Sequence, residues 1–393
     1  MPSPAPDRPG LLIRDPYHYS DATLIIPPEL VGCLQFFDGE RTDLDLRAAL
    51  VELTGDLRVG DLEQHLVSTL SQAGFFEDEV YQRMKDARHA EFAEAPRRAP
   101  AHAGAGYPDQ PEELRSALAG WMDGGAPATA GDSLVGIAAP HVSPEGGLDS
   151  YRAAYAALGP RYQDRVFVIL GTSHYGEPER FGLTRKPFAT PYGEAVTDIA
   201  LVDRLASESG SAVKMEDYCH AVEHSIEFQV VFLQHLYGAG IRILPILCGP
   251  FARSIQGGGP PEEDENVRRF LGALGELAAH EGERLFWVLG VDMAHMGRRY
   301  GDPFAARAGE GQMSSVTRFD HGRIERIGAA DAAGFWESVQ ENRDALKWCG
   351  SAPFYTFLRA VPQSQGELLH YQQWNIDEQS VVSFGAMAFR KNP

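Results

Sequence analysis

The sequence predicts an α/β fold with a central, mostly parallel sheet and helices on both faces, preceded by a small, mostly helical domain. Four short and almost uninterrupted apolar runs in the second part of the chain indicate strands that are covered on both faces. Stretches with helical spacing of apolar residues separate these runs, and such alternation is typical of α/β sheets. The runs are LVGIAAP, RVFVILG, IRILPILCG and RLFWVLG, which begin at residues 134, 165, 241 and 284.

The first part of the chain has a different pattern. Residues 1–10 are rich in proline and we expect them to be disordered, and residues 11–28 indicate short extended segments. Three amphipathic patterns follow, ELVGCLQFF, LDLRAALVEL and DLEQHLVSTLSQAGFF. We therefore predict a small helical domain over residues 11–85, a linker rich in Ala, Pro and Gly over residues 86–106, and the α/β domain over residues 107–393.

Composition argues against several classes of function. The formal net charge of -20 disfavours nucleic acid as a partner, because binding to phosphate backbones normally depends on clusters of Lys and Arg. The four cysteines form no C-x-x-C pair, which argues against a disulfide framework or a zinc ribbon and favours a reducing compartment. No signal peptide and no long apolar segment are present, so we expect a cytoplasmic protein without a membrane partner.

Functional side chains follow three of the four predicted strands. His141 follows the first, His174 follows the second, and Asp292 with His295 follows the fourth. Ligand sites of open α/β sheets lie outside the carboxyl ends of the strands, so these residues should converge. We also expect the strands before His141 and His174 to be neighbours, about 4.8 Å apart, which would let both imidazoles bind one metal ion. Spacing alone leaves open the alternative of ordinary hydrogen-bonding histidines.

Two further segments carry reactive side chains. AVEHSIEFQVVFLQHLY, residues 221–237, has helical spacing and places Glu223, His224 and Glu227 near its start. These residues either complement a helix N-terminus or supply acid, base or supporting groups to the same crevice. Cys349 lies just before another helical pattern, where a thiol can have a lowered pKa and bind metals as the thiolate; the alternative is a buried structural cysteine.

Six short motifs occur in the order seen in the Memo family, also called AmmeMemoRadiSam system protein B. The segment AGAGYP with the following P-E-E-L, from Ala103 onward, also resembles the opening of that family, AGxxYPxxPxxL. The resemblance covers about residues 102–390. The six motifs are APH at 139–141, ILGTSH at 169–174, TPYG at 190–193, EHSIE at 223–227, D-x-x-H at 292–295 and CG at 349–350.

The resemblance implies a fold like that of the class III extradiol dioxygenases and a metal bound by two histidines and one cysteine. Carried over by motif, the ligands would be His141, His174 and Cys349, and the metal would be iron(II) or copper, with zinc as a further fit. Asp292 and His295 would lie beside the metal, and His224 would line the crevice. These three residues would move protons or orient substrate.

This chain departs from the family pattern in the wall of the pocket. Family members often have PSHH where this chain has Thr172-Ser173-His174-Tyr175, so a phenol replaces a second imidazole. They often have APHAGY where Val142, Ser143 and Pro144 follow His141. The substrate is therefore not indicated by the resemblance.

Residues 11–85 resemble, more loosely, the small winged-helix peptide-binding domains of the PqqD type. Such a domain would recruit a peptide or protein partner by adding a strand to its sheet. The main functional hypothesis is a redox enzyme related to the extradiol dioxygenases, acting on an unidentified small molecule. The alternative is a metal-binding adaptor without turnover, and a third hypothesis is a zinc hydrolase.

Overall fold

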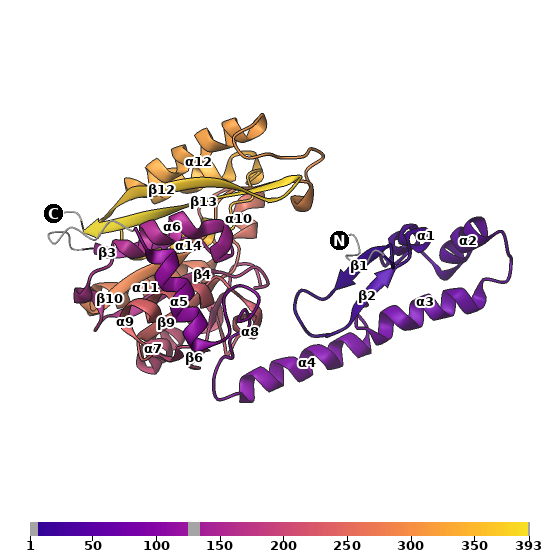
Figure 1. Ribbon diagram of the computed structural model, residues 1–393, viewed down its shortest axis with the longest axis horizontal. Coiled ribbons are helices and arrows are strands. Elements are labelled where there is room, and N and C mark those ends of the chain that lie inside the picture. The colour runs from indigo at the N-terminus through magenta and orange to yellow at the C-terminus, as the bar shows by residue number, and fades with distance from the viewer. Residues whose placement is uncertain (1–6, 125–133, 392–393) are drawn as a thin grey trace. The chain divides into compact units, whose positions relative to one another are not determined.

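The computed structural model describes residues 7–124 and 134–391 (Figure 1). The chain divides into two compact units, Met1–Glu94 and Ala95–Pro393, and each is described by itself. Part of the segment expected to be disordered, residues 1–6, lies outside the described residues.

The first unit combines a two-stranded antiparallel sheet with a few short helices. In the sheet, Leu11 pairs with Ile26. The second helix begins with a capping box, in which Thr42 and Asp45 each bind the backbone of the other, and ends at Gly55, whose φ of 71° suits a residue without a Cβ. The elements are β1 (Leu11–Arg14), β2 (Thr23–Ile26), α1 (Pro28–Val31), a 3-10 turn (Gly32–Phe36), α2 (Asp43–Thr54), α3 (Gly60–Gln72) and α4 (Glu79–Glu94).

Helix α4 extends into the segment that the sequence predicts as a linker. The helix continues to Glu94, because EVYQRMKDARHAEFAE contains many good helix formers and neither Gly nor Pro. Pro96 follows the helix end, and the boundary between the compact units falls between Glu94 and Ala95. The remaining residues of the expected linker, 95–106, therefore belong to the second unit.

The second unit is built on a sheet whose four central strands are parallel and lie in the order β3, β10, β4, β9. These four strands confirm the prediction that the four apolar runs form buried strands. Their bounds are β3 (Leu134–Ala139), β4 (Val166–Thr172), β9 (Arg242–Cys248) and β10 (Leu285–Gly290).

The expectation that β3 and β4 are neighbours is wrong, because β10 lies between them. Trp287 of β10 pairs with Gly136 on one side and with Val168 on the other. A Cβ at Gly136 would lie 2.7 Å from the carbonyl oxygen of Trp287, so the glycine allows this close approach. Two strand spacings, about 9.6 Å, therefore separate β3 from β4.

Helices cover both faces of the sheet, as predicted. Along β4, Val166, Val168 and Leu170 face one buried cluster, whereas Phe167 and Ile169 face the other. The first cluster includes residues of α7 (Ile199–Ser209), α11 (Glu265–Glu281), α12 (Gln312–Gly328), α13 (Ala332–Gln340) and α14 (Ser351–Ala360). The second includes residues of α5 (Pro111–Met122), α6 (Pro144–Ala156) and α9 (Glu227–Tyr237).

Antiparallel strands extend the sheet at both sides. The long hairpin of β12 (Ser364–Asp377) and β13 (Ser380–Lys391), yellow in Figure 1, joins the sheet through β13 and β3. The other elements are β5 (Phe181–Leu183), β6 (Phe188–Thr190), β7 (Gly193–Thr197), β8 (Val213–Met215), β11 (His295–Gly297), α8 (Cys219–Val222) and α10 (Ala252–Gly257). In the described parts of the chain, no helix is long and apolar enough to cross a membrane.

Candidate metal centre

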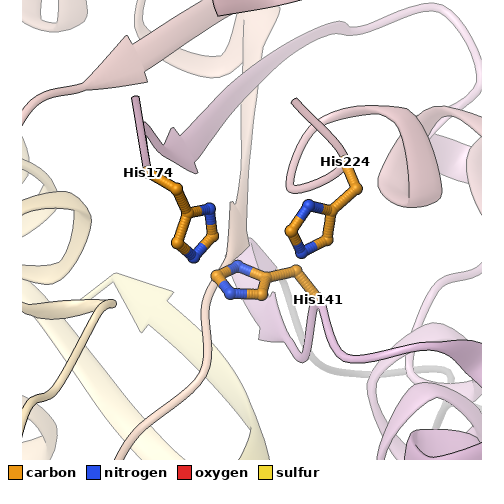
Figure 2. A group of neighbouring side chains, drawn as sticks. All are labelled: His141, His174 and His224. Carbon is orange, nitrogen blue, oxygen red and sulfur yellow. The ribbon is translucent and has the colours of Figure 1, made fainter. Parts of the chain in front are cut away.

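Three imidazoles meet at the carboxyl ends of the parallel strands (Figure 2). His141 follows β3 by two residues, and its ring centroid lies 5.0 Å from that of His174, which follows β4. His224, from the segment before α9, lies 5.1 Å from each of the other two rings. The side chains therefore span the strand that separates β3 from β4.

One nitrogen of each histidine is available to a common ligand. Nδ1 of His141 lies 2.9 Å from the carbonyl oxygen of Gly290, and Nδ1 of His174 and His224 lie 3.0 and 3.1 Å from Oε1 of Glu223. These contacts leave the Nε2 atoms for a metal, and the candidate ligand atoms of the three residues lie within 4.8 Å of one another. Nitrogens that share a tetrahedral metal ion are about 3.3 Å apart, so small movements would complete the site.

Glu223 organises two of the three imidazoles from behind. Its carboxylate is buried and accepts the backbone N–H groups of His174 and His224, each at 2.9 Å, in addition to contacting both rings. Burial alone would raise the pKa of Glu223, but the imidazoles of His174 and His224 hold that pKa well below its usual range. Carboxylates in this position orient metal-binding histidines and raise their basicity.

The continuous helix that the spacing of residues 221–237 indicates is interrupted. Helix α8 ends at Val222 and α9 begins at Glu227, and Glu223 has an extended backbone with φ -79° and ψ 139°. The break is stabilised by the carboxylate of Glu223 and by Ser225, whose hydroxyl donates to the carbonyl of Thr172 at 2.8 Å. Because these polar contacts outweigh the periodicity, His224 lies in a turn that faces the strand ends.

Cys349 lies against the same group. Its Sγ is 3.3 Å from Nε2 of His141, close to the spacing of about 3.5 Å expected for a sulfur and a nitrogen on one tetrahedral metal ion. Burial raises the pKa of Cys349, but the charges of His141 and His295 and hydrogen bonds from His141 and His174 lower that pKa to about 5. The lowered pKa favours the thiolate of Cys349, the form that binds metals.

The chain before Cys349 is strained and firmly held. Four non-glycine residues there have φ between 52° and 55°, a region that L-residues seldom adopt and in which outliers cluster at active sites and switch regions. The carboxylate of Asp344 accepts hydrogen bonds from Nη1 of Arg323 and from the backbone N–H of Trp348, both at 3.0 Å. These bonds fix the backbone that leads to Cys349. The four residues are Asn342, Arg343, Asp344 and Lys347.

Asp292 and His295 lie beside this group. Oδ1 of Asp292 accepts the backbone N–H of His141 at 2.9 Å, and Oδ2 lies 3.5 Å from Nε2 of that histidine. Burial lowers the pKa of His141, yet Asp292 and Cys349 outweigh it and raise that pKa to about 9. His295 is held by the carbonyl of Met293, 2.9 Å from Nδ1, and its ring packs edge-on against Tyr300.

The centre is open on one side. The side chain of His141 is 2 % exposed, whereas those of His174 and His224 are 28 % and 29 % exposed. A cavity of about 240 Å³ lies next to His174 and Cys349 and is large enough for a small organic molecule. Its apolar lining includes Phe251, Ile255, Trp336 and Trp348.

Sequence reasoning missed two residues near the centre. Arg98 lies in the expected linker, and nothing in its Pro- and Ala-rich surroundings indicates that its side chain is buried. Tyr300 packs against His295 from a short 3-10 turn, and no motif marks it. Tyr175, the departure from the family pattern, lies farther out, with its ring centroid 6.3 Å from that of His174.

The fold and the site define an α/β protein with a histidine cluster at the carboxyl edge of its parallel strands. A family model described as Memo-like protein matches residues 98–388 of the chain. The chain therefore belongs to the Memo family, as the motifs predict.

One relative extends the similarity to the N-terminal unit. A MEMO1 family protein of Aquifex aeolicus is 24% identical over 382 residues, which cover 96% of this chain and 95% of the relative. A MEMO1 family protein of Thermococcus kodakarensis is 30% identical over 266 residues, covering 64% of this chain and 86% of the relative. Among solved structures, an uncharacterized protein of Escherichia coli K12 matches 65% of this chain and 99% of its own, with TM-score 0.40 and 13% identity.

Proposed function

We propose that this chain is a metal-dependent redox protein that binds iron(II) or copper through His141, His174 and Cys349. The observation that supports the proposal is a cluster of three imidazoles whose candidate ligand atoms lie within 4.8 Å of one another, with Sγ of Cys349 3.3 Å from Nε2 of His141. His224 contributes the third nitrogen of this group and is the additional ligand that the geometry favours.

The donor set favours this choice of metal. Imidazole suits iron, copper and zinc, whereas a thiolate selects against magnesium and calcium. Nδ1 of His141 lies against a carbonyl and Nδ1 of His174 against a carboxylate, which would leave each Nε2 for a metal, and the lowered pKa of Cys349 favours a deprotonated sulfur.

The surroundings favour turnover over storage. A bound iron or copper ion would supply one-electron chemistry at a position open to small molecules. The cavity beside Cys349 would hold an uncharged substrate part against Trp336 and Trp348. Asp292 would accept a proton beside His141, and His295 would hold one beside Cys349, because both residues lie next to the donor atoms.

Metal analysis of anaerobically purified protein tests the proposal. The wild type should contain close to one iron or copper ion per chain, and His141→Ala, His174→Ala and Cys349→Ala should each lose most of it. A parallel His224→Ala variant shows whether His224 is a ligand or only lines the crevice. Equal metal content in wild type and all variants, or none after reconstitution, would refute the proposal.

The same metal analysis distinguishes the redox enzyme from a zinc hydrolase. Zinc as the bound metal, with hydrolysis of ester or phosphoester probes and no dependence on oxygen, would favour the hydrolase over the redox enzyme. The ligands would be unchanged, because zinc accepts the same donors.

The adaptor hypothesis concerns the N-terminal unit, whose β1 and β2 form a two-stranded sheet to which a partner could add a strand. Leu44 and Leu57 of this unit are 72 % and 85 % exposed, and a partner would gain by burying these apolar side chains. Under this hypothesis the unit binds a peptide or protein partner. Selection of displayed peptides on the full chain, with Leu44→Lys and Leu57→Lys as comparison variants, tests it; peptides that bind all three proteins equally would contradict this surface.

A further inference from the structure

Arg98 is a buried charge within the second unit. Its side chain and that of Glu227 are both fully buried, and the two form an ion pair. The guanidinium also stacks over Phe188, with its central carbon 5.3 Å from the ring centroid. A buried guanidinium is stable only when its donors are paired, so the position of each acceptor matters.

The acceptors of Arg98 belong to the segment that carries the metal-facing groups. Nε donates to the carbonyl oxygen of His220 at 2.8 Å, and Nη2 donates to the carbonyl oxygen of Glu223 at 2.8 Å. The planar guanidinium fixes these two acceptors relative to each other, because its donors diverge in a rigid fork. Glu223 in turn contacts both His174 and His224 with its carboxylate.

The residues after Arg98 also bind the segment that carries Glu223 and Glu227. Glu227 accepts the backbone N–H groups of Ala101 and His102 at 3.1 and 2.9 Å, and it also accepts the hydroxyl of Tyr107. The ring of His102 packs edge-on against that of His224, with centroids 5.5 Å apart. Residues 98–107 therefore pack against the segment that carries Glu223, His224 and Glu227, although they contribute none of the proposed ligands.

We propose that Arg98 is a positioning residue of the metal centre, which sets the orientation of His174 and His224 through the backbone and carboxylate of Glu223. This inference rests on the metal site proposed above. Loss of groups that orient metal ligands typically lowers metal affinity 10- to 100-fold, so we expect at least a tenfold loss when the fork is removed.

Titration of the full-length chain with Co(II) under argon tests this role. Co(II) reports its coordination through visible absorption bands, so each titration gives both an affinity and a signature of ligand geometry. The variants are Arg98→Met, Arg98→Lys and the double variant Arg98→Met with Glu227→Gln, which removes the buried charge pair together. Arg97→Met is the matched control, because the neighbouring Arg97 side chain is 60 % exposed and pairs with Glu194 at the surface.

We expect Arg97→Met to match the wild type in both affinity and bands. The Arg98 variants should lose affinity at least tenfold and show shifted bands, with Arg98→Lys intermediate because lysine keeps the charge but not the fork. Wild-type affinity and bands in Arg98→Lys, or in the folded double variant, would overturn the positioning role. A wild-type chain that binds no Co(II) would instead refute the metal site, and the positioning role with it.

Discussion

Replacing Glu223 with glutamine should weaken metal binding about 10- to 100-fold. Nδ1 of His174 and Nδ1 of His224 lie 3.0 and 3.1 Å from Oε1 of Glu223, so one carboxylate oxygen accepts a hydrogen bond from each ring, and Oε2 accepts the backbone N–H of His174 at 2.9 Å. A glutamine has one acceptor oxygen and one donor amide, so it cannot accept both from the two rings at the position of Oε1 and from the backbone N–H of His174 at the position of Oε2.

The magnitude follows from this loss of one acceptor. With the glutamine amide toward the rings, the imidazoles must accept at Nδ1, which moves their protons to Nε2, the atom that faces the metal position. With the amide on the other side, it opposes the backbone N–H of His174 and displaces that histidine. One ligand is then lost or must rotate, and loss of such supporting carboxylates typically costs 10- to 100-fold in affinity. In free energy of binding this is about 1.4 to 2.7 kcal/mol.

Competition with a chelator of known affinity measures the change. Glu208→Gln is the control, since Glu208 lies on α7 and pairs with Arg204 at the surface, away from the centre. Urea unfolding of the metal-free proteins separates loss of affinity from loss of fold. If a folded Glu223→Gln protein binds the metal as tightly as wild type, Glu223 does not set the tautomers of these histidines and the reasoning fails.

Three further predictions address the thiolate, the buried carboxylate and the core. Burial raises the pKa of each of the other three cysteines, so a thiolate at neutral pH should come from Cys349 alone. After chelator treatment, wild type should therefore absorb more near 240 nm than Cys349→Ser at pH 7, and this difference should disappear as pH falls through about 5. A midpoint near 9 would contradict this prediction. Asp292→Asn should retain metal, because its Oδ1 can still accept the N–H of His141, but should abolish turnover of any substrate found; retained turnover excludes proton transfer by Asp292. Leu274→Ala, at a fully buried position of α11, should lower the free energy of unfolding by about 2 to 5 kcal/mol in urea titrations and leave metal content unchanged. A loss below about 1 kcal/mol would show that the core around Leu274 collapses onto the smaller side chain.

The sequence alone determined the class of the fold and the principal residues at its edge. Apolar runs of six or seven residues predict buried parallel strands, since a strand covered on both faces needs apolar side chains on both. The carboxyl-end rule then indicates that His141, His174 and Asp292 converge. The motifs in order indicate the Memo family, because spacing over nearly 300 residues is far more specific than any single tripeptide.

Strand order and the break at Glu223 were decided only by the tertiary structure. Local periodicity cannot show that β10, distant in sequence, inserts between β3 and β4, because that order depends on how whole strands pack. Nor can it show that the carboxylate of Glu223 replaces a helical turn, since its partner His174 is distant in sequence.

The burial of Arg98 is a third feature that local sequence could not predict. In the sequence, Arg98 lies among Ala and Pro residues that indicate a solvated linker, and composition gives no reason to bury it. In the folded chain its ion pair with Glu227 and its bonds to His220 and Glu223 compensate for burial, and these acceptors lie more than 120 positions away. Sequence thus determined which elements form and which functional side chains follow them, whereas packing between distant segments decided how the residues of the candidate metal centre are held.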